Sequence, residues 1–252
     1  MKQITALLLL LTVFQINIAL GQEESKPSLF IPSFSADYSF QIPGGDLKDR
    51  FGNNSMIGSS FQIKLKSNFT LGVKAGFIFG ANVKEPNMFR YILPSEGQFI
   101  NTYGNQALVM ISERGFHFST EVGKIFPFSN KNPDSGLWLK GSLGLLQHKI
   151  RIDNDGNNVP YIIEEYSKGY DRLTNGLAVT EFVGYIFYGE SMIANFYAGF
   201  EFYQAFTQCR RDYNFDDLGS DLKKRKDYLY SFKLGWIIPL YKRINPDKYF
   251  YY

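Results

Sequence analysis

Three residues of one short segment have the types and the spacing of a hydrolytic site. His117, Ser119 and Glu121 occur at every second position of the run HFSTE, and alternate residues of a β-strand share one face. A serine hydroxyl becomes a nucleophile when a base lies within about 3 Å of it. The other interpretation is a polar network inside a barrel, and we favour that one.

A second candidate region is the charged run DYNFDDLG and its flanks. Four of its residues carry side-chain oxygens at roughly alternate positions and are followed by a glycine: Asp212, Asn214, Asp216 and Asp217. Calcium-binding loops have a similar arrangement. The bidentate glutamate that closes such a loop is absent, so we predict no metal site. The flanking basic residues are candidates for contact with phosphates or with a partner protein, although solvated loop charge is the simpler interpretation: Arg210, Arg211, Lys223, Lys224, Arg225 and Lys226.

The other chemistry-bearing residues do not form a cluster. His148 stands alone, and the run DNDGN at 153–157 indicates a turn. Cys209 is the only cysteine, so the chain forms no internal disulfide. We therefore predict no cofactor. The formal net charge of +3 over 252 residues argues against a nucleic-acid partner.

The first residues have the features of an export signal. Lys2 precedes an apolar run from Leu7 to Phe14 that is too short to span a bilayer, and a small-x-small pattern ends at Gly21. We expect residues 1–21 to be a signal peptide and Gln22 to begin the mature chain. No cysteine follows the apolar run, which argues against a lipid anchor. A membrane-anchoring helix is the alternative.

Alternation of apolar and polar residues predicts β-strands along the rest of the chain. In FTLGVKAGFIFGAN, at 69–82, large apolar residues such as Phe77 alternate with glycines, Lys74 and Ile78. Seven further segments have the character of strands: 33–42, 57–66, 116–122, the stretch from 136 onward, 177–188, 196–206 and 228–240. A phase shift near Leu145-Leu146 predicts a bulge. The segment 177–188 is apolar in both phases, and its orientation stays open.

The connections between these strands are unequal. Long ones near 83–106, 153–176 and 208–226 alternate with tight ones such as Ser67-Asn68, a pattern typical of outer-membrane barrels. We predict an all-β fold, an eight-stranded antiparallel transmembrane β-barrel with long extracellular loops and short periplasmic turns. The expected organisation of the chain is a signal peptide, a periplasmic segment, the barrel and a periplasmic tail, at 1–21, 22–32, 33–241 and 242–252.

The polar phase of these strands then faces the lumen. An eight-stranded barrel has an interior just wide enough for side chains, so we expect the acids and bases of this phase to pair across it: Asp37, Lys64, Lys74, Glu121, Lys140, Glu201 and Lys233. A soluble lipocalin-like barrel, with the apolar phase inside, is the alternative. The unequal connections and the glycines of the polar phase favour the membrane barrel.

Three of these features together resemble a known family. The export signal ending in Gly21-Gln22, the aromatic strands and the F-x-x-G patterns are similar to the outer-membrane β-barrel family of Bacteroidota that includes PorT-like proteins. The resemblance covers most of the mature chain and implies assembly in the outer membrane of a Gram-negative bacterium. Such barrels often end in an aromatic last strand, whereas here YLYSFKLGWIIPLY is followed by KRINPDKYFYY, so the segment that signals assembly stays open.

A second, narrower resemblance concerns the first candidate site. His117 and Ser119 resemble the His-x-Ser pair of outer-membrane lipid deacylases, except that Thr120 stands where asparagine is usual in those enzymes. We nevertheless predict a non-enzymatic structural or accessory component whose long loops bind a partner, as a possible subunit of a larger assembly or secretion machine. The expected partners are outer-membrane lipid, lipopolysaccharide and a membrane or surface protein. The alternatives are small-solute passage, ligand binding in the barrel and a lipid-acting hydrolase.

Overall fold

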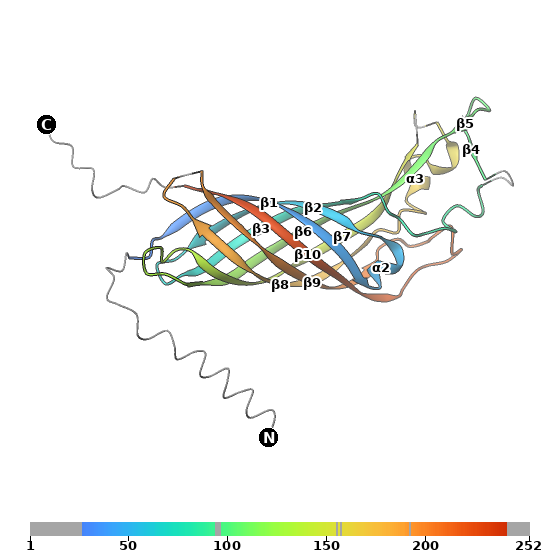
Figure 1. Cartoon of the computed structure of the whole chain (residues 1–252). Helices are drawn as coiled ribbons and strands as arrows, with labels where there is room; N and C mark the ends of the chain where they lie inside the picture. Colours follow the sequence, from blue (N-terminus) through green and yellow to red (C-terminus); the bar gives the residue numbers. More distant parts are fainter. Residues whose placement is uncertain (1–26, 94–96, 155, 157, 192, 241–252) are drawn as a thin grey trace, which may run out of the picture.

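Eight antiparallel strands close into a barrel. The computed structural model describes residues 27–93, 97–154, 156, 158–191 and 193–240. The strands follow one another in the order β1, β10, β9, β8, β7, β6, β3, β2, and the first strand pairs with the last (Figure 1). The predicted eight-stranded antiparallel barrel is thus confirmed. The expected signal peptide at 1–21, Gln22 and the expected tail at 242–252 lie outside the described residues.

The strands lie where alternation predicted them, but most are longer than expected. Their bounds are β1 Ile31–Gly45, β2 Asn54–Lys64, β3 Phe69–Gly80, β6 Val109–Pro127, β7 Gly136–Asn154, β8 Thr174–Tyr188, β9 Asn195–Cys209 and β10 Lys224–Pro239. The largest difference is in β6, which begins well before the expected 116–122. Its early residues were missed because polar residues such as Arg114 face outward there and hide the alternation.

The apolar phase of every strand faces outward. Val73 is 53% exposed and Phe200 65% exposed, whereas the polar Lys74 and Glu201 beside them are buried. In water, so continuous an apolar exterior would be very unfavourable, but it is the exterior that a bilayer requires. The barrel is therefore a membrane-spanning one, and the alternative of a lipocalin-like interior is wrong. None of the described helices is long and apolar enough to cross a membrane.

The expected bulge in β7 does not form. The pairing of β6 with β7 runs without interruption from Val109 opposite Asn154 to Pro127 opposite Gly136. Leu146 and Ile150 keep the inward phase and are buried in an apolar cluster. The sequence suggested a phase shift because Leu146 is apolar yet faces inward. The inside of this barrel is apolar at this level and not polar throughout.

The sequence left undecided which residues of 177–188 face inward, and the burial pattern of β8 shows which do. Ala178, Phe182 and Ile186 are buried inside the barrel, and Leu177 and Val183 are exposed outside. Both phases are apolar because the inward residues of this strand belong to the apolar clusters at either end of the lumen.

The connections divide the barrel into two ends. The turn end carries 65–68, 128–135 and 189–194, and Asn68 adopts the left-handed conformation that a tight turn needs (φ 64°). The loop end carries 46–53, 81–108, 155–173 and 210–223. These contain short elements: α2 Leu47–Arg50, β4 Phe99–Ile100, β5 Gln106–Ala107, η3 Pro160–Ile162 and α3 Glu164–Ser167. β6 and β7, of 19 residues each, project beyond the other strands at this end (Figure 1).

We call the described part of the three longest loop-end connections the cap: 81–93, 97–108, 158–173 and 210–223. An apolar cluster continues from the loop end of the lumen into the cap, joining Met56 and Ile78 of the barrel to Met88, Phe89 and Ile162 of the connections. A second apolar cluster fills the turn end around Trp138 and Ile237. The network of lysines and carboxylates around Glu201 lies between these two clusters.

Candidate functional site

The centre of the lumen is an ion network around Glu201. Lys74 donates hydrogen bonds to the Glu201 carboxylate at 3.1 Å and to the Tyr203 hydroxyl at 3.0 Å. Lys233 forms an ion pair with the same carboxylate, and Tyr203 donates to it at 2.6 Å. β3, β9 and β10 supply these groups, so the network joins opposite walls of the barrel.

Two further acids complete this layer. Lys233 Nζ lies 4.0 Å from Asp37, which also accepts a hydrogen bond of 3.2 Å from the Tyr197 hydroxyl. Lys140 donates to Glu121 at 2.9 Å, with its ammonium 4.4 Å from the centre of the Trp138 ring. Formal charges in the layer balance, because each lysine is offset by a carboxylate. All six of these predicted lumen residues are buried: Asp37, Lys74, Glu121, Lys140, Glu201 and Lys233.

Lys64, the seventh predicted lumen residue, belongs to a different contact. Its ammonium lies 2.7 Å from Asp134, in the connection between β6 and β7 at the turn end. It also donates to Ser28 Oγ at 2.8 Å, before β1 begins. The contact therefore ties the start of the barrel to a turn, and the sequence analysis missed Asp134 because it lies outside the alternating strands.

The structure does not assemble His117 and Ser119 into a nucleophile and its base. Both residues are buried in the lumen, and within the described chain neither ring nitrogen of His117 nor Ser119 Oγ has a hydrogen-bond partner. His117 instead packs edge-on against Tyr203, with ring centres 5.1 Å apart. Thr120, the third residue of the comparison, faces outward.

His148 has a partner that spacing did not reveal. Its Nε2 lies 3.0 Å from Asp227 Oδ2 of β10, and the Thr207 hydroxyl donates to the same oxygen at 2.5 Å. Phe51 packs edge-on against the imidazole, with ring centres 5.6 Å apart. These residues lie near the loop end of the lumen, below the cap. Cys209 is also buried and faces the lumen.

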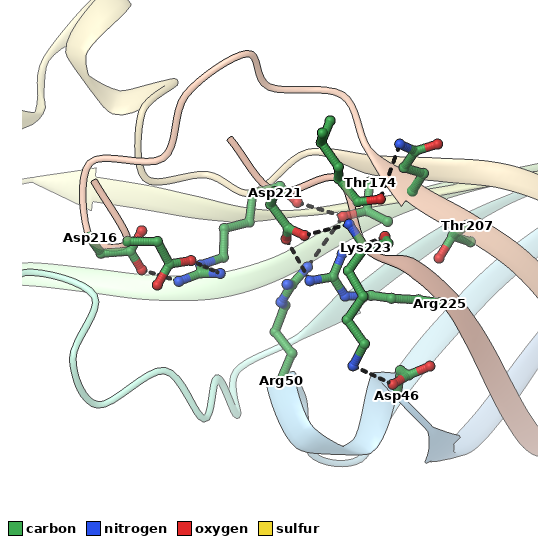
Figure 2. Close-up of polar contacts among 12 residues, drawn as sticks. Asp46, Arg50, Thr174, Thr207, Asp216, Asp221, Lys223 and Arg225 are labelled. Carbon is green, nitrogen blue, oxygen red and sulfur yellow. Dashed lines mark hydrogen bonds and ion pairs between the residues drawn. The ribbon is translucent and has the colours of Figure 1, made fainter. Parts of the chain in front are cut away.

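At the loop end, arginines of the cap and of α2 join connections that are far apart in sequence. Arg172 pairs with Asp216 and, at 3.1 Å, with Asp217. Arg50 of α2 donates to Glu85 at 3.0 Å. It also donates to Thr174 at 3.2 Å (Figure 2). Burial and the nearby charge of Arg225 lower the pKa of Arg50. These contacts hold the connections to one another and to the barrel rim.

The acidic run at 212–217, which resembled a calcium loop, forms ion pairs with an arginine of the cap instead. The carboxylates of Asp216 and Asp217 face Arg172, and Asn214 forms a β-bridge with Gly219. No group of three or more metal-ligating side chains occurs in the described part of the chain. The run 153–157 falls partly on residues that the structure does not describe.

The six predicted loop cations divide into two groups. Arg211 forms a two-pronged contact with Asp171 at 2.6 and 2.8 Å, Arg225 lies 2.5 Å from Asp221, and Lys223 lies 3.0 Å from Asp46 (Figure 2). Burial raises the pKa of Asp221, but the hydrogen bond and charge of Arg225 outweigh this and lower it below its ordinary value. The second group consists of exposed cations without an ion pair to a carboxylate among the described residues: Arg210, which donates to the Asn175 side chain, Lys224 and Lys226.

The outer surface of the cap is rich in exposed tyrosine, which the sequence analysis did not single out. Tyr103 is 80% exposed and Tyr166 60% exposed, and three more tyrosines of the cap are about half exposed or more: Tyr91, Tyr161 and Tyr213. Tyr103 sits in the turn between β4 and β5. A count of tyrosines in the expected loops would have identified this surface.

Comparison with known proteins gives distant likenesses of structure. No model of a protein family matches the chain, and no curated protein matches it significantly. The structure is similar to Ail, the attachment invasion locus protein of Yersinia pestis, with 10% identity, a TM-score of 0.43 and coverage of 83% of this chain and 99% of Ail. Ail solved with the heparin analogue sucrose octasulfate gives 13% identity, a TM-score of 0.38 and coverage of 83% and 99%.

A third structure gives a similar result. The outer membrane protein OprG from Pseudomonas aeruginosa has 9% identity and a TM-score of 0.35, with coverage of 84% of this chain and 98% of OprG. Identities and TM-scores this low do not transfer a function from these proteins to this chain. The chain's own geometry shows a closed membrane-spanning β-barrel with a filled lumen and an ordered, tyrosine-rich cap.

Proposed function

We propose that this protein is a non-enzymatic outer-membrane β-barrel whose cap binds a protein partner at the cell surface. The observation that carries the proposal is the exposure of several tyrosines on an ordered scaffold. Tyrosine is enriched in binding interfaces because it offers a large contact area and a polar hydroxyl while losing little conformational entropy. Tyr103, the most exposed of them, is the best single candidate for a contact residue.

The order of the cap supports binding by a preformed surface. Phe89 packs edge-on against Phe99 at 5.1 Å, and Tyr170 packs against both Phe89 and Phe215 at 5.4 and 5.3 Å. These rings connect all three long connections. A surface held in this way loses less entropy on binding than a flexible loop does.

The other function classes find less support in the lumen. Solute passage needs an open path, but the described lumen holds a balanced ion network between two apolar clusters. A hydrolase needs its serine beside a base, and His117 and Ser119 do not make that hydrogen bond.

The finer assignments belong to the same proposal. Membership of the Bacteroidota family that includes PorT-like proteins rests on the sequence resemblance alone, because an eight-stranded barrel does not distinguish that family from others. Location in the outer membrane of a Gram-negative bacterium, with the cap outside the cell, is supported by the apolar exterior and by the grouping of the long connections at one end. Lipopolysaccharide phosphates are expected contacts of Arg210, Lys224 and Lys226.

Photo-crosslinking in intact cells tests the proposed binding surface. A photoreactive amino acid replaces Tyr103 in one variant and Lys66, an exposed residue of a turn-end connection, in the control. We expect a discrete crosslinked protein from position 103 but not from position 66, identified by mass spectrometry. The absence of a crosslink at 103, with correct heat-modifiable folding of that variant, would contradict partner binding by the cap.

A further inference from the structure

One carboxylate faces outward in the middle of the apolar exterior. Glu181 lies at the centre of β8 and is exposed, with Leu177 and Val179 outward on one side of it and Val183 and Tyr185 outward on the other. Among the outward positions of the eight described barrel strands, the only other carboxylate is Asp153, at the loop-end tip of β7. Glu181 is therefore the one acid that this barrel presents to the hydrocarbon of the bilayer.

Within one copy of the chain, one described side chain, that of Gln204, donates a hydrogen bond to Glu181. The Gln204 amide, on the outward face of β9, donates to both carboxylate oxygens at 3.3 Å. These are long hydrogen bonds, and an ionised carboxylate accepts more than one amide can supply. Ionisable groups on a lipid-facing surface are costly and rare, and such groups usually face protein or water instead.

This face carries one hydrogen-bond acceptor, Glu181, and one donor, Gln204, so it is complementary to the same face of a second copy. Two copies in one membrane with the same orientation are related by a twofold axis along the membrane normal, which preserves the depth of every residue. The side-chain ends of Glu181 and Gln204 meet at a similar depth on neighbouring strands, because they are hydrogen bonded, while their backbone positions differ by two residues in register. An axis between them would set Glu181 of each copy opposite Gln204 of the other, surrounded by Val183, Phe200 and Phe202.

We propose that the β8–β9 face of the barrel binds a second copy of this chain, with Glu181 and Gln204 paired across a twofold axis. The second copy covers the carboxylate from lipid and supplies it with a second amide donor. The face lies in the bilayer, apart from the cap, so the dimer does not depend on the partner proposed for the cap. Both copies keep their caps on the same side of the membrane.

Cysteine crosslinking in intact outer membranes tests this face. Phe202 faces outward and is the cross-strand neighbour of Glu181; Phe202→Cys is made in a Cys209→Ser background. Val73→Cys on β3, on the opposite side of the ring, is the matched control. We expect a disulfide-linked species with twice the chain's mass from position 202 and none from position 73. A crosslink to a different protein at 202, or equal crosslinking at both positions, would overturn the proposal.

Native mass in mild detergent tests the role of the polar pair. We expect the wild type to be a dimer, and the double variant Glu181→Leu, Gln204→Leu to be a monomer that keeps its heat-modifiable gel shift. Replacing a lipid-facing polar pair by leucine does not disfavour the barrel itself, so loss of the dimer is separable from loss of folding. Glu181→Gln keeps hydrogen-bonding groups at both positions and should preserve the dimer. A monomeric wild type, or a double variant that stays dimeric, would refute the pairing.

Discussion

At the scale of single residues, each buried charge at the centre of the lumen is stabilised by oppositely charged or hydrogen-bonding partners. Glu201 accepts from Lys74, Lys233 and Tyr203, all of them buried. Taking a charge out of water is unfavourable unless a partner compensates it. Removing one shared partner therefore affects more than a single contact.

Glu201→Ala tests this dependence. It leaves Lys74 and Lys233 without their shared carboxylate, and the loss of one partner from a buried ion pair typically costs about 3–5 kcal/mol. We expect a correspondingly lower free energy of unfolding, measured by urea titration of the refolded barrel with the heat-modifiable gel shift as readout.

The matched control removes an exposed acid. Glu165→Ala breaks the exposed pair between Glu165 of α3 and Lys168, the residue that follows α3, and a change of about 0–1 kcal/mol is expected. Equal unfolding midpoints for Glu201→Ala and Glu165→Ala would show that the central network contributes no special stability.

At the scale of elements, neighbouring strands approach closely where glycine faces a strand backbone. A Cβ added at Gly144 of β7 would lie 2.0 Å from the carbonyl oxygen of Phe118 on β6. A Cβ added at Gly141 of the same strand would meet nothing within 4 Å. The pairing of β6 and β7 therefore requires glycine at one position and tolerates a side chain at the other.

The pair of variants Gly144→Ala and Gly141→Ala tests this difference within one strand. We expect Gly144→Ala to lower the free energy of unfolding by about 1–3 kcal/mol, as overpacking does, while Gly141→Ala leaves it nearly unchanged. The measurement is again urea unfolding of the refolded barrel. If both variants unfold at the wild-type midpoint, that result would contradict the claim that β6 lies too close to β7 for a side chain at position 144.

At the scale of the whole molecule, the barrel is a filled cylinder with an ordered cap. Apolar clusters occupy both ends of the described lumen, and the ion network lies between them. A path for ions would require moving side chains from opposite walls at the same time. On the function proposed above, the membrane-spanning part supports the cap, and the cap carries the surface expected to bind a partner outside the membrane.

Conductance across a planar lipid bilayer tests the closed lumen. We expect no steady current from the purified, heat-modifiable protein at neutral pH, because no continuous water-filled path crosses the ion network and the two clusters. An open porin inserted under the same conditions is the control for detection. A reproducible single-channel conductance would contradict the filled lumen and would make solute passage the favoured function.

The sequence by itself determined which residues share a face on almost every strand, and it favoured the apolar face as the outer one. Side chains alternate strictly along a strand, so Val73 and Lys74 must face opposite ways wherever the strand lies. The same rule predicted the number of strands. The rule failed where its signal was weak. One such place is Leu146, an apolar residue on the inward phase, and the other is the start of β6, where polar and apolar residues are mixed on both phases.

Only the tertiary structure decided which groups meet. Lys74 and Glu201 are 127 residues apart in sequence, on strands that do not pair, and they meet because the barrel closes. Asp134 and the tyrosines of the cap escaped notice because connections follow no period, and Asp227 did so because β10 begins before the expected 228–240. Alternation specifies the face on which each side chain lies, whereas the register and closure of the sheet determine its partner across the lumen.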